Sequence, residues 1–249
     1  KKTSMSLMLS SVGRMMMKIN LTHPNPALIS IIKEPEQIIT LDANFLIPPD
    51  RRPITKRGIS FEQFREIWLD PIFSVFPNLA IHESVYDELV GISPQNYVDS
   101  KRDSIPPEII IHKDSSLTEV EKILRDTIET RIALHTKYEP LLDNKDDRGE
   151  VKSLSYIAVK GLLYFAANDN NAIQLIEKSE EWSTGLDNVQ AIKMYELIYY
   201  LYKNNLADKT AVKMLYKYQY YLTNREKSTN PCWGDFSSSM DNLYDPYFK

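Results

Sequence analysis

The stretch Ile38-Ile39-Thr40-Leu41-Asp42-Ala43-Asn44-Phe45-Leu46-Ile47 decides the fold that we predict for this chain. Its apolar run is typical of a strand that is buried in a parallel sheet. Asp42 ends the first part of the run, and Asn44 follows two residues later. An ionised carboxylate is costly in a buried strand unless it is paired or bound to a cation, which makes Asp42 a candidate metal ligand. Taken alone, Asp42 is more typical of a turn or of a helix N-cap.

The rest of the chain alternates segments with strand-like and helix-like patterns. Besides 38–47, the patterns predict strands at 79–81, 108–112 and 162–167. They predict helices after Ser60 and over 83–89, 117–138, 150–160 and 172–181, and helical structure from about 187 onward. We expect loop structure over 92–107 and a loosely docked tail from 228. This alternation predicts an α/β fold with a central parallel sheet covered by helices on both faces.

Composition excludes several classes of protein. The 249 residues are 43% hydrophobic and 26% charged, with a formal net charge of -4, so a strongly basic nucleic-acid binder is not indicated. A nuclease stays open, because such enzymes cluster acids at the centre and bases at the rim. The single cysteine, Cys232, excludes a disulfide framework and a multi-cysteine zinc site, and favours a reducing compartment. No apolar run is long enough to span a bilayer, and we expect a cytoplasmic protein.

We divide the chain into three parts by pattern. Residues 1–37 form an N-terminal leader or arm, 38–185 an α/β domain, and 186–249 a C-terminal helical extension and tail. The first 33 residues contain no acid and several bases. A targeting leader or basic arm is one interpretation, and a frayed terminus with a packed or disordered methionine cluster is the other. The second is favoured, because the apolar part is too broken for a secretory signal.

Four acids recur at positions where a parallel α/β sheet forms its sites. Asp42 and Asp169 each follow a predicted strand, Glu88 lies in the helix after the second strand, and Glu150 lies in the first turn of a later helix. Ligands bind beyond the carboxyl ends of such strands, so the four side chains can meet in one crevice. Carboxylates suit Mg²⁺, and a metal held by them activates water and neutralises charge on a phosphodiester.

Each acid also has a competing interpretation or a competing neighbour. Glu83 and Asp87 compete with Glu88 for a place in the site. Asp146 and Asp147 compete with Glu150. Asp169 is also a plausible N-cap for the helix that follows it. The joint occurrence of the four acids therefore carries the prediction.

The order of four motifs resembles that of the PIN-domain nucleases. The motifs are Leu41-Asp42-Ala43-Asn44-Phe45-Leu46, Tyr86-Asp87-Glu88-Leu89-Val90-Gly91, Arg148-Gly149-Glu150-Val151-Lys152-Ser153-Leu154 and Phe165-Ala166-Ala167-Asn168-Asp169-Asn170-Asn171. The resemblance implies a Rossmann-like PIN domain with extra C-terminal helices, acting as a Mg²⁺- or Mn²⁺-dependent endoribonuclease. It implies that the catalytic and metal-binding residues are Asp42, Glu88, Glu150 and Asp169, with Asn44 and Asn171 in support. The chain departs from the pattern in its terminal extensions, in the long spacing between the second and third acids, and in Asn171, where a second metal would favour aspartate.

The resemblance implies an RNA substrate and leaves other partners open. A toxin paired with an antitoxin, a stand-alone nuclease, another protein partner and a homo-oligomer all remain compatible with it, and no membrane partner is expected. The bases Arg51-Arg52 and Lys56-Arg57 are either phosphate contacts or a solvated loop. The alternative function is a catalytically inactive PIN-like scaffold that binds proteins through its tyrosine-rich helices, although helical spacing favours packing of those tyrosines. A nucleotide-binding domain is disfavoured by the lack of a glycine-rich phosphate loop.

Overall fold

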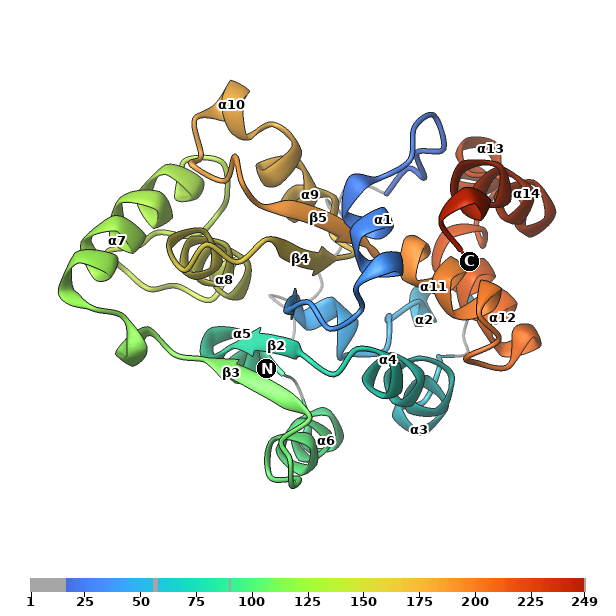
Figure 1. The fold of residues 1–249 in the computed structure, drawn as a ribbon, viewed down its shortest axis with the longest axis horizontal. Coiled ribbons are helices and arrows are strands. Elements are labelled where there is room, and N and C mark those ends of the chain that lie inside the picture. Colours follow the sequence, from blue (N-terminus) through green and yellow to red (C-terminus); the bar gives the residue numbers. More distant parts are fainter. Residues whose placement is uncertain (1–16, 56–57, 90, 249) are drawn as a thin grey trace, which may run out of the picture.

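The computed structural model describes residues 17–55, 58–89 and 91–248. Within these residues lies one five-stranded, all-parallel sheet with the strand order β3-β2-β1-β4-β5 (Figure 1). The strands are β1 (Ile39–Leu41), β2 (Leu79–His82), β3 (Ile109–His112), β4 (Tyr164–Ala167) and β5 (Gln190–Lys193). Helices flank the sheet, which gives a Rossmann-like arrangement and confirms the predicted α/β class.

Helices make up most of the remaining described chain. The α-helices are α1 (Pro26–Lys33), α2 (Arg52–Thr55), α3 (Phe61–Phe64), α4 (Asp70–Val75), α5 (Glu83–Glu88), α6 (Ile92–Arg102), α7 (Glu119–Ala133), α8 (Arg148–Val159), α9 (Asn170–Glu177), α10 (Ser179–Trp182), α11 (Met194–Lys203), α12 (Lys209–Tyr220), α13 (Asn224–Thr229) and α14 (Trp233–Tyr244). The short segments η1 (Ala43–Phe45), η3 (Asp114–Ser116) and η4 (Asp245–Tyr247) are 3-10 helices, and η2 (Arg65–Leu69) is a π-helical turn. No helix in the described ranges combines the length and apolarity needed to cross a membrane.

The local sequence explains most of these elements. Every residue of β1, β2 and β4 is buried, as expected for inner strands of a parallel sheet. Ser60 and Gln63 form the capping box that begins α3, and Thr118 and Glu121 form the one that begins α7. α8 packs against α5, α7 and β2, while α1, α9 and α11 pack against β5. One continuous apolar core joins all of these elements.

The first strand is shorter than predicted. It ends at Leu41, and Asp42 begins the 3-10 helix η1 in place of continuing the strand to residue 47. The apolar residues after Asp42 are buried as predicted, but for another reason, because Phe45 packs edge-on against Trp68. The Trp68 indole N–H also donates to the Phe45 carbonyl oxygen at 3.0 Å.

Three other segments correct the sequence-based assignment. The helix expected from about 187 is preceded by β5, a strand of the sheet that lies in the part we had assigned to the C-terminal extension. The loop expected over 92–107 contains the helix α6. The tail expected to dock loosely contains α14, which buries Trp233, Phe236, Met240 and Tyr244. In each case packing against distant segments supplies apolar contacts that the local sequence pattern does not predict.

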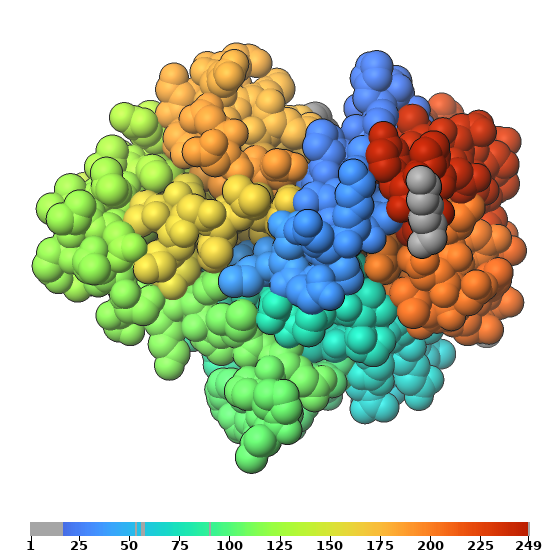
Figure 2. All heavy atoms as spheres, in the orientation of Figure 1, coloured from blue at the N-terminus to red at the C-terminus, as the bar shows by residue number. Residues whose placement is uncertain are grey.

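The two ends of the described chain pack on each other (Figure 2). The Ile19 backbone N–H donates to Asn230 Oδ1 at 3.0 Å, and the Asn25 amide donates to both carboxylate oxygens of the buried Glu196. The Asn25 backbone N–H donates to the Tyr244 hydroxyl oxygen at 2.7 Å. The methionine-rich part of the predicted leader, residues 1–16, lies outside the described residues.

Candidate metal centre

β1 and β4 form the switch point of the sheet, where the strand order reverses after β3. The Asp42 backbone N–H donates to the Ala166 carbonyl oxygen at 2.9 Å, which places Asp42 at the carboxyl end of the β1–β4 ladder. Asp169 follows the end of β4 by two residues. Neighbouring strands lie about 4.8 Å apart, so the two acids leave the sheet side by side at the position where open α/β sheets bind ligands.

Glu88 reaches this edge from the last turn of α5. Its Oε1 accepts a 2.6 Å hydrogen bond from the backbone N–H of Gly149, at the start of α8. Burial is the main cause that raises the pKa of Glu88 to about 7. The negative charges of Asp42 and Asp147 add to this effect, while the Gly149 hydrogen bond and the Arg148 charge oppose it. Glu88 and Asp42 are therefore close enough to repel each other in a partly desolvated place.

Asn171 connects the other two acids. Its backbone N–H donates to Asp169 Oδ1 at 2.8 Å, so Asp169 is the N-cap of α9, as its competing interpretation predicted. Its side-chain amide donates to Glu150 Oε1 at 3.3 Å. Glu150 is 8% exposed and Asp42 is 5% exposed, so both need polar partners. Asn171, which was predicted as a supporting residue, thus bridges the ends of β4 and α8.

Asn44 contacts the first acid as predicted. Its side-chain amide donates to Asp42 Oδ2 at 2.7 Å. The 3-10 helix η1 carries Asn44 back beneath the strand end, so a residue two positions along the chain faces the carboxylate. This hydrogen bond restricts the rotation of the Asp42 carboxylate.

The structure separates the four acids from two neighbours that competed with Glu88. Glu83 turns toward β3, because its Oε1 accepts the backbone N–H of Asp114 at 2.8 Å. Asp87 is exposed and lies 3.5 Å from an Arg148 guanidinium nitrogen. Of the three acids on α5, Glu88 is the one that accepts a hydrogen bond from the backbone of α8.

The acids that competed with Glu150 have other surroundings. Asp147 precedes α8 in a left-handed conformation, and its Oδ2 accepts the backbone N–H of Lys137 at 3.0 Å. Asp146 is exposed. Glu150, in the first turn of α8, is the acid of this segment that contacts Asn171.

A cavity of about 460 Å³ adjoins Glu88. It is lined by Asp87, Glu88, Asp143, Lys145 and Arg148. Two cations here face three acids, and Arg148 is held by Asp143 at 2.9 Å. The cavity therefore offers mixed charge beside Glu88 and not a strong anion site.

The predicted basic cluster after β1 is largely engaged within the protein. Arg51 pairs with the buried Glu226, and Arg52 pairs with Asp50 at 2.7 Å. Lys56-Arg57 lies outside the described residues. The tyrosine-rich helices use their rings for packing, as favoured from the sequence, because Tyr195, Tyr199, Tyr216 and Tyr220 are all buried.

A second group of possible metal ligands lies at the ends of β2 and β3. Among the described residues, His82, Glu83 and Asp114 are the one set of three histidine, cysteine or acidic side chains whose ligand atoms lie within 4.8 Å of one another, so this group could hold a metal ion. No sequence motif singles out His82 as a ligand. Its signal is a histidine at a buried strand end followed directly by glutamate, which is weak without the contact to Asp114.

Protein partners already engage this second group. His82 Nδ1 lies 2.7 Å from Ser84 Oγ, and its Nε2 lies 3.3 Å from Asp114 Oδ1. Burial opposes ionisation of Asp114, but the hydrogen bond from His82 and the positive charge of Arg125 lower the pKa of Asp114. His82 also begins α5, since its Nδ1 accepts the Ser84 backbone N–H.

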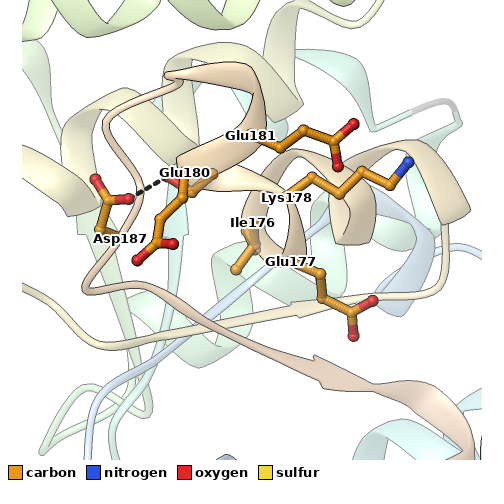
Figure 3. Close-up of a pocket in the computed structure, with 7 residues that line it drawn as sticks. Ile176, Glu177, Lys178, Glu180, Glu181 and Asp187 are labelled. Carbon is orange, nitrogen blue, oxygen red and sulfur yellow. Dashed lines mark hydrogen bonds between the residues drawn. The ribbon is translucent and has the colours of Figure 1, made fainter.

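A third acidic feature is remote from the sheet edge that carries the four acids. A pocket of about 350 Å³ is lined by Ile176, Glu177, Lys178, Ser179, Glu180, Glu181 and Asp187 (Figure 3). It lies at the C-terminal end of α9, whereas Asp169 caps the N-terminal end, and eight helical residues span about 12 Å. Ser179 Oγ donates to Asp187 Oδ1 at 3.1 Å, and Lys193 pairs with Glu177 at 2.6 Å.

No protein-family model, curated protein or solved structure matches this chain. The likeness to PIN-domain nucleases thus stays a prediction from four motifs. The contacts at the switch point of the sheet are therefore the basis for a proposed function.

Proposed function

We propose that this protein is a Mg²⁺- or Mn²⁺-dependent endoribonuclease of the PIN type, which hydrolyses RNA phosphodiester bonds at the four-acid group of Asp42, Glu88, Glu150 and Asp169. The observation that carries the proposal is the placement of two carboxylates at the switch point of the sheet. Asp42, 5% exposed, stands at the carboxyl end of the β1–β4 ladder, and the half-buried Glu88, which the Gly149 N–H holds, is near enough for the charge of Asp42 to help raise its pKa. Two carboxylates in a desolvated place are unfavourable without a cation, so their juxtaposition favours a cation site over a purely structural role.

The donor set fits a hard cation. Mg²⁺ prefers carboxylate oxygens, keeps several waters and is usually held by only one or two carboxylates together with phosphate oxygens. A closed shell of three protein ligands is not needed for that ion, in contrast to zinc. Asp42 and Glu88 would hold the ion, with Asp169 and Glu150 in reach of its waters. When bound, such an ion supplies activation of water and charge neutralisation at the phosphodiester.

The surrounding residues orient these carboxylates. Asn44 restrains Asp42, the Gly149 N–H holds Glu88, and Asn171 holds Glu150. Lys145 lines the cavity beside Glu88 and is exposed, so it can contact the RNA backbone without a change in the fold. Ionised Glu88 and Asp42 exclude a bare phosphate from the edge until a cation offsets their charge.

The decisive experiment is cleavage of a defined RNA by purified protein with and without Mn²⁺. Asp42→Asn should reduce the metal-dependent rate by about 100-fold or more, because it removes a ligand and a charge. Asp103→Asn is the matched control, since Asp103 is exposed just after α6 and pairs with Arg102 on the surface. Unchanged cleavage by the Asp42→Asn protein would refute the proposal.

Thermal unfolding separates an inactive scaffold from a nuclease. A ligand that binds only the folded state raises the melting temperature. We expect Mn²⁺ to raise it for the wild-type and Asp103→Asn proteins but not for Asp42→Asn. A wild-type protein with neither a Mn²⁺-dependent shift nor cleavage would favour the catalytically inactive scaffold.

A further inference from the structure

The C-terminal helices contact both loops that leave the sheet at the switch point. We call residues 219–226, which comprise the end of α12, the connection and the first turn of α13, the α12–α13 corner. The Tyr220 hydroxyl donates to Asn168 Oδ1 at 2.5 Å, and Asn168 lies between the end of β4 and Asp169. Arg51, in the loop that follows η1, pairs with Glu226 and donates to the Gln219 carbonyl oxygen at 3.4 Å. Figure 1 shows α12 and α13 at the side of the molecule beyond α11.

Packing fixes the Tyr220 hydroxyl in place. The side chain is 2% exposed, and its ring packs edge-on against Tyr195 with 6.0 Å between centroids. Tyr216 packs on it from within α12 at 5.6 Å. The backbone carbonyl of Tyr220 accepts the Asn230 side-chain amide at 3.0 Å. The ring and the backbone are thus both held, so the hydroxyl has one place to point.

Asn168, the acceptor of this hydrogen bond, lies in the short segment that joins β4 to α9. Asn168 separates Ala167, the last residue of β4, from Asp169, which caps α9. Only one methylene joins the side-chain amide of Asn168 to its backbone. A side-chain amide that is held in place therefore also restrains the backbone next to Asp169. The backbone N–H of Asn171 donates to the Asp169 carboxylate, so its hydrogen bond depends on where that carboxylate lies.

We propose that Tyr220 is a positioning residue that sets the carboxylate of Asp169 through Asn168, which makes the C-terminal helices part of the metal centre. This inference rests on the proposed function. The second contact supports it from another direction, because the Arg51 pair with the buried Glu226 ties the loop after Asp42 to the same corner. Removal of a direct outer partner of a metal ligand typically weakens metal binding by about 10–100-fold. Tyr220 acts one residue further out, through Asn168, so we expect a loss at the lower end of that range.

Tyr220→Phe tests the inference, with Tyr216→Phe as the matched control. Both changes remove one buried hydroxyl from α12 and keep the ring, and the Tyr216 hydroxyl donates to the Pro231 carbonyl oxygen at 2.7 Å, away from the four acids. We expect Tyr220→Phe to weaken Mn²⁺ binding by roughly 10-fold, measured by calorimetric titration, and Tyr216→Phe to leave it within about twofold.

A measurement on the metal-free protein adds a second readout. We expect hydrogen exchange at the backbone N–H of Asn171 to accelerate by roughly 10-fold in Tyr220→Phe and to stay near the wild-type rate in Tyr216→Phe. Asn168→Ala removes the acceptor in place of the donor and should reproduce both effects, and the double variant with Tyr220→Phe should be no worse than either single change.

The outcomes distinguish this inference from the proposed function. A wild-type protein that binds Mn²⁺ while Tyr220→Phe and Tyr216→Phe behave alike in both measurements overturns the positioning role alone. A wild-type protein that does not bind Mn²⁺ overturns the proposed function and the positioning role together. Selective loss in Tyr220→Phe and Asn168→Ala supports the inference.

Discussion

The carboxylate of Glu88 lies where a side chain of residue 149 would begin. A Cβ built on Gly149 would fall 2.6 Å from Glu88 Oε2 and 2.8 Å from its Cδ. The absence of that atom lets the Gly149 backbone N–H approach Glu88 Oε1 to 2.6 Å. Glycine is therefore needed at this helix start for close approach of a carboxylate, and not for a left-handed backbone.

The effect of Gly149→Ala on the free energy of unfolding should change sign when Glu88 is replaced. In the wild-type background we expect a loss of about 1 kcal/mol in the free energy of unfolding, because displacement of Glu88 costs more than the gain in helix propensity. In a Glu88→Ala background the same change should stabilise by up to about 1 kcal/mol. Urea denaturation of the four proteins measures the cycle. Equal effects in both backgrounds would show that residue 149 does not restrict Glu88.

Glu88→Gln should stabilise the metal-free protein at alkaline pH. The pKa of Glu88 is raised from 4.5 to about 7, so the folded state holds a proton that the unfolded state has lost between these values. Stability contributed by this group is present below pH 4.5 and is lost as pH rises to about 7. Because Glu88 is partly exposed, we expect the advantage of glutamine at pH 8 over pH 4.5 to be on the order of 1–2 kcal/mol.

The measurement is chemical denaturation of both proteins in a chelating buffer from pH 4.5 to 8. Glu62→Gln, on the exposed part of α3, serves as the control and should show no such trend. A difference between Glu88→Gln and wild type that does not grow with pH would contradict the desolvation of Glu88. Addition of Mn²⁺ should favour the wild-type protein and reverse the order at pH 8.

Asn44→Ala should weaken the metal site without removing a ligand. Its amide restrains Asp42 Oδ2 at 2.7 Å, and loss of such an outer partner typically costs at least about 10-fold in metal affinity. Titration with Mn²⁺ measures the change. Asn96→Ala, on the exposed side of α6, is the control and should bind as the wild type does. Equal affinity of the two variants would leave Asn44 with only a local role in η1.

His82→Asn should separate the two groups of candidate ligands. Asparagine retains an N-cap for α5, while the contact with Asp114 is lost, so we expect a destabilisation of about 1–3 kcal/mol. The Mn²⁺-dependent rise in melting temperature should persist in this variant and disappear in Asp42→Asn. The opposite result would assign the Mn²⁺ response to His82, Glu83 and Asp114.

Local pattern alone predicted much of the fold because strand and helix periodicity reside in neighbouring residues. The apolar runs at β1, β2, β3 and β4, the capping box at Ser60, and the helices around Glu88 and Glu150 are all predicted in this way. Parallel topology then followed from the alternation, and with it the meeting of Asp42 and Asp169 at one edge of the sheet. The sequence determined which acids could form a site.

Tertiary structure decided which residues those acids contact and which hydrogen bonds hold their carboxylates. Glu88 and Gly149 lie 61 positions apart, and Tyr220 and Asn168 lie 52 positions apart, so no local pattern reports either contact. The choice of Glu88 over Glu83, the engagement of Arg51 by Glu226, and the place of β5 in the sheet depend in the same way on packing between distant segments. Chain periodicity sets which face of an element is buried, but only the packed elements determine which side chains share a crevice.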